Sequence, residues 1–251
     1  NTGWFEPGHQ PKPMFESVMY GAAGIARHAE LTQLLLDHGA DPNDGETPYH
    51  VPETYDLSTM RVLLNSGRLT ADSLATMLLR KCDWHDLAGI HLMLEHGADP
   101  QQPTVWGHNA LHQAMRRDNA MPIVAALVAK GADARLLNRE GLSAVVLAAR
   151  RGRGDALAFF AEQGWATPTL GLDGLLAACA LGDAATARSL LSAAPALQGE
   201  LLAGAGEALA QFAGNGNSTG VGLLLDLGVP VTALNEAGDG YFEIAPRSQA
   251  L

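Results

Sequence analysis

Apolar residues recur along most of this chain with the spacing of short amphipathic helices. Between positions 28 and 37, Leu31, Leu34 and Leu35 fall three and four positions apart, which places them on one side of a helix. Gly39 follows directly, and a glycine ends a helix in the left-handed conformation without a Cβ penalty. The pattern therefore predicts a helix with a sharp stop.

This helix and its stop are repeated along the chain. The segment 92–100 is nearly the same nonapeptide as 34–42, and 126–133 is a third copy. The stops are separated by 28 to 34 positions and lie at Gly39, Gly67, Gly97, Gly131, Gly164, Ala194 and Gly228. We expect the helices before them at 28–37, 56–65, 86–95, 120–130, 154–163, 183–193 and 217–227. A period of this length is typical of a repeat architecture.

A second, shorter helix precedes each of these. Its clearest starts are Thr47-Pro48, a Thr cap followed by a Pro suited to the first helical turn, and Asn109, which caps Ala110-Leu111-His112. Pro52 should shorten the helix of the second unit. After Gly67 and Ala194 the chain enters helix-forming sequence (71–81 and 200–212) without the usual entry motif, so these two units should lack a protruding hairpin.

The unit resembles the ankyrin repeat. The best copy runs from Gly107-His108-Asn109-Ala110-Leu111-His112 through Gly131-Ala132-Asp133 and follows the pattern Gly-x-Thr-Pro-Leu-His, two helices and Gly-Ala-Asp. The resemblance implies an all-α ankyrin-repeat solenoid of about seven stacked helix-turn-helix units over 14–235. Residues 1–13 should form an extended lead-in. Residues 236–251 resemble the start of a further, truncated repeat, so we expect the natural chain to continue.

Charge and composition limit the classes of partner. The net charge of -11 disfavours nonspecific binding to nucleic acid or to an anionic membrane, since either requires a positive face. Only two cysteines are present, which is compatible with the cytoplasm, and no apolar stretch is long enough to span a membrane. The chain begins with Asn1 rather than Met, which leaves room for a removed leader and for a secreted effector. High Ala, Gly and Leu usage favours a bacterial origin.

No residue pattern indicates catalysis, a cofactor or a metal. His85, His91 and His96 follow Cys82, but their spacing does not place them on one helix face as metal ligands at i and i+4 would be. His50 and His112 match the repeat's own histidine, which the resemblance implies ties neighbouring loops together. Cys179 lies among small residues and is expected to be a buried packing thiol. We therefore expect no enzyme activity.

Stacking should use the apolar positions and leave one long concave surface free for a protein partner. The expected stacking residues are Leu35, Leu64, Leu94, Leu127, Phe160, Leu191 and Leu225. Between positions 116 and 153 the chain has eight basic and three acidic residues, and this excess of positive charge favours a partner with an acidic surface. The candidate partner-binding residues are Trp84, Val105, Trp106, His108, Arg116, Arg117, Arg139, Leu142, Arg150 and Arg151. The alternative is that these arginines are solvated surface and that the tryptophans cover loop bases.

Three functions fit a binding array of this kind. The first is an adaptor or inhibitor that holds a partner on the concave face. The second is a targeting arm of a larger enzyme or secreted effector whose catalytic region lies outside this chain. The third is a structural role through self-association. The sequence identifies no particular partner.

Overall fold

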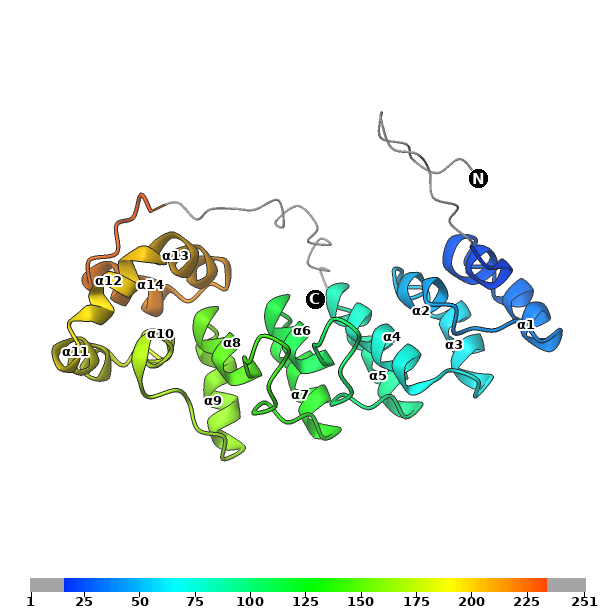
Figure 1. Cartoon of the computed structure of the whole chain (residues 1–251), viewed down its shortest axis with the longest axis horizontal. Coiled ribbons are helices and arrows are strands. Elements are labelled where there is room, and N and C mark those ends of the chain that lie inside the picture. Colours follow the sequence, from blue (N-terminus) through cyan, green and yellow to red (C-terminus); the bar gives the residue numbers. More distant parts are fainter. Residues whose placement is uncertain (1–15, 234–251) are drawn as a thin grey trace.

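Helix pairs stack side by side into an arch in a computed structural model that describes residues 16–233 (Figure 1). The first helices of the pairs form the inner row of the curve, and the second helices form the outer row. The pairs are η1 (Tyr20–Ile25) with α1 (Ala29–Asp37), α2 (Glu46–His50) with α3 (Ser58–Asn65), α4 (Ala71–Asp83) with α5 (Leu87–Glu95), α6 (Ala110–Arg116) with α7 (Met121–Ala129), α8 (Ala144–Arg150) with α9 (Gly154–Glu162), α10 (Gly171–Ala180) with α11 (Ala184–Ala193), and α13 (Ala205–Gly214) with α14 (Ser218–Asp226).

The seven predicted units are therefore confirmed, and each outer helix agrees with its expected range within two residues. Within 16–233 no strand forms, and the single isolated β-bridge joins Leu137 to Ser143. None of the helices in this range is long and apolar enough to cross a membrane. The predicted lead-in at 1–13 and the further repeat at 236–251 lie outside the described residues.

Two local predictions need correction. Thr47 does not cap α2, because the helix begins at Glu46 and the carboxylate of Asp44 accepts the Thr47 N–H at 2.6 Å. An aspartate accepts such a bond as well as a threonine, so the capping function has moved three positions upstream. The predicted helix 200–212 is interrupted at Gly204, and an additional helix, α12 (Ala196–Ala203), precedes α13.

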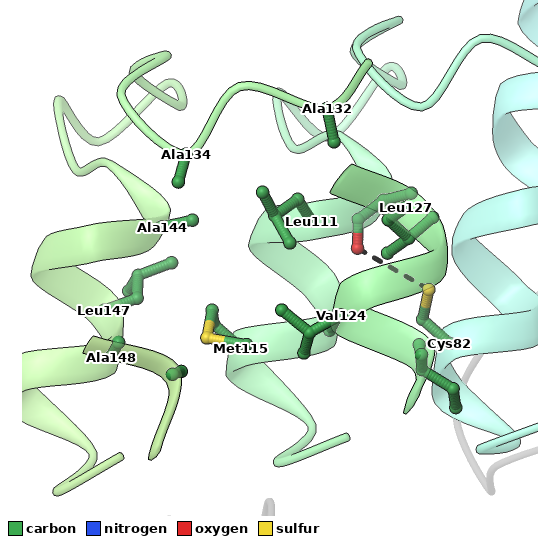
Figure 2. Packing of buried hydrophobic residues seen from close by; sticks show 14 of the residues in the cluster. Cys82, Leu111, Met115, Val124, Leu127, Ala132, Ala134, Ala144, Leu147 and Ala148 are labelled. Carbon is green, nitrogen blue, oxygen red and sulfur yellow. Dashed lines mark hydrogen bonds between the residues drawn. The ribbon is translucent and has the colours of Figure 1, made fainter. Parts of the chain in front are cut away.

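The core consists of apolar side chains between neighbouring units. Figure 2 shows Leu111 and Met115 of α6 between Cys82 of the third unit and Leu147 of the fifth, with Leu127 beside them. Small residues such as Ala132, Ala134, Ala144 and Ala148 allow the units to approach closely (Figure 2). The core is thus continuous across units, as repeat stacking requires.

The predicted stacking residues are buried in the middle of the array and less so at its ends. Leu64, Leu94, Leu127 and Phe160 are buried, and Leu35 and Leu191 are partly buried. Leu225 is 38% exposed, and so that prediction is wrong. Leu223 and Leu224 are buried instead, in the helix α14 that packs on α10 and α13. The predicted stripe on α1 is also wrong in part, since Leu31 and Leu34 are exposed and the buried residues there are Thr32 and Leu36.

In six of the seven units the turn between the two helices contains a left-handed residue. It is non-glycine in three turns and glycine in three others: Arg27, His85, Asp118, Gly152, Gly182 and Gly216. Polar side chains join successive turns. Asn119 donates to the Cys82 carbonyl at 2.9 Å, and Arg153 donates to the Asn119 carbonyl at 2.8 Å. The turns of the third, fourth and fifth units therefore form a hydrogen-bonded row.

The seventh unit leaves this regular arrangement. In Figure 1, α13 and α14 fold over α10 toward the inner row. Asn215 donates to Asp118 Oδ1 and to the Arg151 carbonyl, both at 2.9 Å. The ring of Phe212 covers Gly152, where an added Cβ would lie 2.4 Å from the ring. The last unit thus contacts the fourth and fifth units directly.

Candidate functional site

The inner row contains a cleft of about 260 Å³ that spans the second to fourth units. Its lining comes from α2, the end of α4, the loop before α6 and the end of α6. The residues are Tyr49, Leu79, Arg80, Asp83, Trp106, His108, Gln113, Arg116 and Arg117. We call this the inner cleft. Four of the predicted binding residues, Trp106, His108, Arg116 and Arg117, lie in it.

One wall of the inner cleft is aromatic. The ring centroids of Tyr49 and Trp106 are 5.8 Å apart, and the guanidinium of Arg80 lies 4.1 Å from the centroid of the Tyr49 ring. A cation over an aromatic face is attracted by the ring quadrupole. Arg80 is held in turn by Glu53 and by Asp83, the latter at 2.5 Å. Tyr49 therefore has a fixed support, while Trp106 is 41% exposed.

A second wall of the inner cleft is polar and organised around Asp83. This carboxylate accepts hydrogen bonds from Arg80, Gln113 and Arg117. Its side chain is only 8% exposed, so the three donors compensate for the loss of water. The network joins α4 to α6 and fixes the direction of Arg117.

His108 holds the other arginine of this wall. Nη1 of Arg116 lies 2.8 Å from Nε2 of His108, and because arginine can only donate, the imidazole nitrogen accepts. Burial lowers the pKa of His108, and the nearby positive charge of Arg116 lowers it further. The imidazole is therefore neutral at neutral pH, as this hydrogen bond requires.

Two further predicted residues link the loops of the fourth and fifth units. Arg139 donates through its backbone N–H to the Gly107 carbonyl at 3.0 Å and through Nη2 to the Val105 carbonyl at 2.8 Å. Val105 itself is 70% exposed beside Trp106. The ring of His112 bonds the Leu136 carbonyl at 2.9 Å, in agreement with the predicted link between loops. The same prediction is wrong for His50, whose ring contacts Glu46 and Glu53 of its own unit.

The remaining predicted residues lie outside the inner cleft. Leu142 packs partly buried against the core. Arg150 pairs with Asp173 at 2.6 Å, and Arg151 pairs with Asp118 at 2.5 Å. Trp84 lies in the turn after α4, against the ring of Tyr55. The structure thus separates these four from Trp106 and Arg116.

Ion pairs alter the charge expected of this region. The basic excess between 116 and 153 does not include Asp83 and Asp173, which the fold brings next to Arg117 and Arg150. Arg116 lies 3.6 Å from Glu140, and the side chains of both are largely exposed, at 42% and 55%. Pairing between exposed charges is weak, so the ion pair of Arg116 contributes less binding energy than those of Arg117 and Arg150.

Three residues of the inner cleft, Tyr49, Arg80 and Asp83, were not predicted from the sequence. A signal was present for two of them. Tyr49 stands where the repeat pattern has leucine, and Asp83 occupies the position that Arg116 and Arg150 occupy in the next units, two residues before the left-handed residue of the turn. Arg80 carries no such signal, because its role depends on the distance between α2 and α4.

The described residues offer little for metal or thiol chemistry. Among positions 16–233 no group of three or more His, Cys, Asp or Glu side chains is placed to hold a metal ion. Both cysteines are free and buried. Burial raises the pKa of the Cys82 thiol, and it raises the pKa of Cys179 to about 12. Neither thiol is an available nucleophile.

Comparison with known proteins places the fold. No protein-family model matches the chain, and no curated protein matches it significantly. The ankyrin-repeat domain of Bcl-3, described as a unique member of the IkappaB protein family, is similar with a TM-score of 0.50 and 24% sequence identity, over 57% of this chain and 68% of that one. The ankyrin-repeat domain of human ASB11 is similar with a TM-score of 0.38 and 21% identity, over 93% and 94%. The likeness to the Bcl-3 domain and the stacked helix pairs show that this chain has the ankyrin-repeat solenoid fold.

Proposed function

We propose that this chain is a non-enzymatic scaffold, an adaptor or inhibitor, that binds a protein partner on the inner row of helices. The observation that carries the proposal is the inner cleft, where Trp106 and two arginines with unused donors lie together beside the exposed Val105. Partly exposed aromatic and arginine side chains are the residue types that dominate binding energy at protein interfaces. Fold likeness by itself would not support a function, so the proposal rests on this site.

The proposed partner surface has an acidic component. Arg116 and Arg117 support this, since each uses one guanidinium nitrogen in bonds to described residues and retains others. The ion pairs of Arg150 and Arg151 reduce the long-range positive potential of the basic region between 116 and 153. We therefore expect affinity to depend more on close contacts than on electrostatic steering. The two free, buried cysteines are compatible with the cytoplasmic location that we propose.

Capture of partners with matched variants tests the proposal. Trp106→Ala and Arg116→Gln alter the inner cleft, while Leu34→Ala and Arg61→Gln alter exposed residues of outer helices and serve as controls. We expect at least one protein from the native source to be retained by the parent and by both controls and lost by both cleft variants. If every retained protein binds the cleft variants as well as the parent, the inner row is not the binding surface.

A further inference from the structure

The inner cleft is smaller than a typical small-molecule site. Pockets that enclose drug-sized ligands have volumes of roughly 300–1,000 Å³, whereas this cleft has about 260 Å³. Val105, which precedes Trp106 in the chain, is exposed, and Leu137 of the next loop is also exposed, at 67%. A cleft of this size beside exposed apolar residues is suited to side chains of a peptide rather than to a whole cofactor.

The aromatic wall selects an apolar side chain. Tyr49 is held from one side by Arg80, so its position is fixed before binding, and Trp106 stands next to it with a free surface. An aromatic or large aliphatic side chain packed against this pair of rings would remove the exposed surface of Trp106 from water. Because Tyr49 is already ordered, little side-chain entropy would be lost there.

The arginine wall selects an anion. Arg116 donates through Nη1 to His108, and Arg117 donates through Nε to Asp83, so neither uses its full set of donors within the described part of the chain. A guanidinium presents paired N–H groups that match a carboxylate. The one carboxylate in the lining, Asp83, is already engaged by three donors and therefore does not occupy these free N–H groups.

Taken together, the two walls define a partner. Resting on the proposed function, we propose that the inner cleft binds a peptide segment of the partner that carries an aromatic or large aliphatic residue and, within a few positions, an Asp or Glu. The apolar side chain contacts Tyr49 and Trp106. The carboxylate bonds Arg116 and Arg117 and displaces the weak Arg116–Glu140 contact.

A random 12-residue peptide library displayed on phage and selected on the whole chain tests this directly. We expect enriched sequences that combine an aromatic or large aliphatic residue with Asp or Glu. Binding of a synthetic enriched peptide should weaken by at least about tenfold with Trp106→Ala, as expected of an interface hot spot. The control variants Leu34→Ala and Arg61→Gln should leave its affinity within about twofold. Failure to enrich any peptide, or equal binding by Trp106→Ala, would overturn the proposal.

A double-mutant cycle assigns the carboxylate. Replacing the acidic residue of the peptide by its amide and replacing Arg116 by Gln should each weaken binding about fivefold to tenfold, and the two changes together should be little worse than either one. Independent effects that multiply would overturn the assignment. Arg116→Lys keeps the charge without the planar fork and provides a second variant should Arg116→Gln fail to fold. A phosphoserine peptide that binds over tenfold more tightly than its Glu counterpart would also overturn the choice of a carboxylate.

The two proposals fail in distinguishable ways. A partner protein that is lost with Trp106→Ala while no library peptide is enriched would leave the scaffold function standing and reject the peptide segment. Peptides that bind the cleft while no native partner depends on it would support the cleft's chemistry and count against the scaffold function.

Discussion

The fourth and seventh units differ in how they attach to the rest of the array. The fourth unit stacks inner helix on inner helix, and its loop is tied to the next loop through Gly107, Arg139 and His112. The seventh unit has α12 in place of such a loop, and its contacts reach back to the fourth and fifth units through Phe212 and Asn215. The comparison teaches that a unit can keep its helix pair and still leave the regular row, and that its attachment then depends on a few contacts between distant positions of the chain.

Removing a core side chain from the fourth unit should have the largest effect. Leu127 is fully buried between the third and fifth units. Leu127→Ala should lower the free energy of unfolding by about 2–5 kcal/mol, because it leaves a cavity that a close-packed stack cannot fill. The partly exposed Leu225 of α14 is the matched control, and Leu225→Ala should change it by less than about 0.5 kcal/mol. Urea titration measures both. Equal effects would mean that Leu127 of the fourth unit and Leu225 of the seventh unit are equally well packed.

A methyl group at the contact between the fifth and seventh units should have the next largest effect. Gly152 has φ of +67°, and a Cβ there would lie 2.4 Å from the Phe212 ring and 2.9 Å from its Cα. Gly152→Ala should therefore destabilise the protein by about 2–4 kcal/mol, from backbone strain and overpacking together.

Gly164 separates these two causes. Its φ is +78°, but no atom lies within 4 Å of an added Cβ. Gly164→Ala should therefore show the strain alone, about 1–2 kcal/mol. If both variants unfold at the same urea concentration, the seventh unit does not rest on Gly152 in solution.

Asn215 should contribute a smaller share of the same contact. Its amide donates to Asp118 and to the Arg151 carbonyl across 97 and 64 positions of sequence. Asn215→Ala should cost about 1 kcal/mol, the usual net value of a hydrogen bond or slightly more. The midpoint of thermal unfolding should fall accordingly, and an unchanged midpoint would show that the fold-back relies on other contacts, such as those of Phe212 and Asn217 with Gly152.

The smallest expected effect is on how the free energy of unfolding changes at acidic pH, and it concerns His112 in the regularly stacked fourth unit. Burial lowers the pKa of His112 below its ordinary value of 6.5, although the hydrogen bond to the Leu136 carbonyl acts in the opposite direction. Below pH 6.5 the unfolded chain then binds more protons at this group than the folded chain does, so the stability it contributes is lost as the pH falls. His112→Gln should reduce the loss of unfolding free energy between pH 7 and pH 5. No histidine follows His112 in the sequence, so the seventh unit contributes nothing to this term.

The fold could be predicted from sequence because the same residue pattern recurs in successive units. Spacing of the stops predicted every outer helix, and the Asn109 cap is observed with the bond to the His112 N–H at 3.0 Å. The position of the last unit could not be predicted in this way. In the sequence, Gly152 and Asn215 cannot be distinguished from other turn residues. Only the folded structure shows that Gly152 packs against the Phe212 ring and that Asn215 bonds Asp118.

The candidate site was predictable only in part, for a related reason. Trp106, His108, Arg116 and Arg117 lie at outward positions of one repeat, so the register located them. Asp83 and Asp173 lie about one unit away in sequence and still neutralise arginines of the fourth and fifth units. A charge count along the chain cannot include such partners, because stacking brings together residues some 20 to 35 positions apart.

The hydrogen bond from Asn215 to Asp118 also bears on the order in which the array comes apart. A linear stack normally frays from both ends, because each end unit has one neighbour. Here the seventh unit is fastened to the fourth and fifth, while the first is held by the second through contacts such as Arg27 to the Glu53 carbonyl. Amide protons of α1 should then exchange with solvent through small local openings, whereas those of α13 and α14 should exchange together with those of α8. The C-terminal half would behave as one cooperative block, and the N-terminal half as a chain of separable steps.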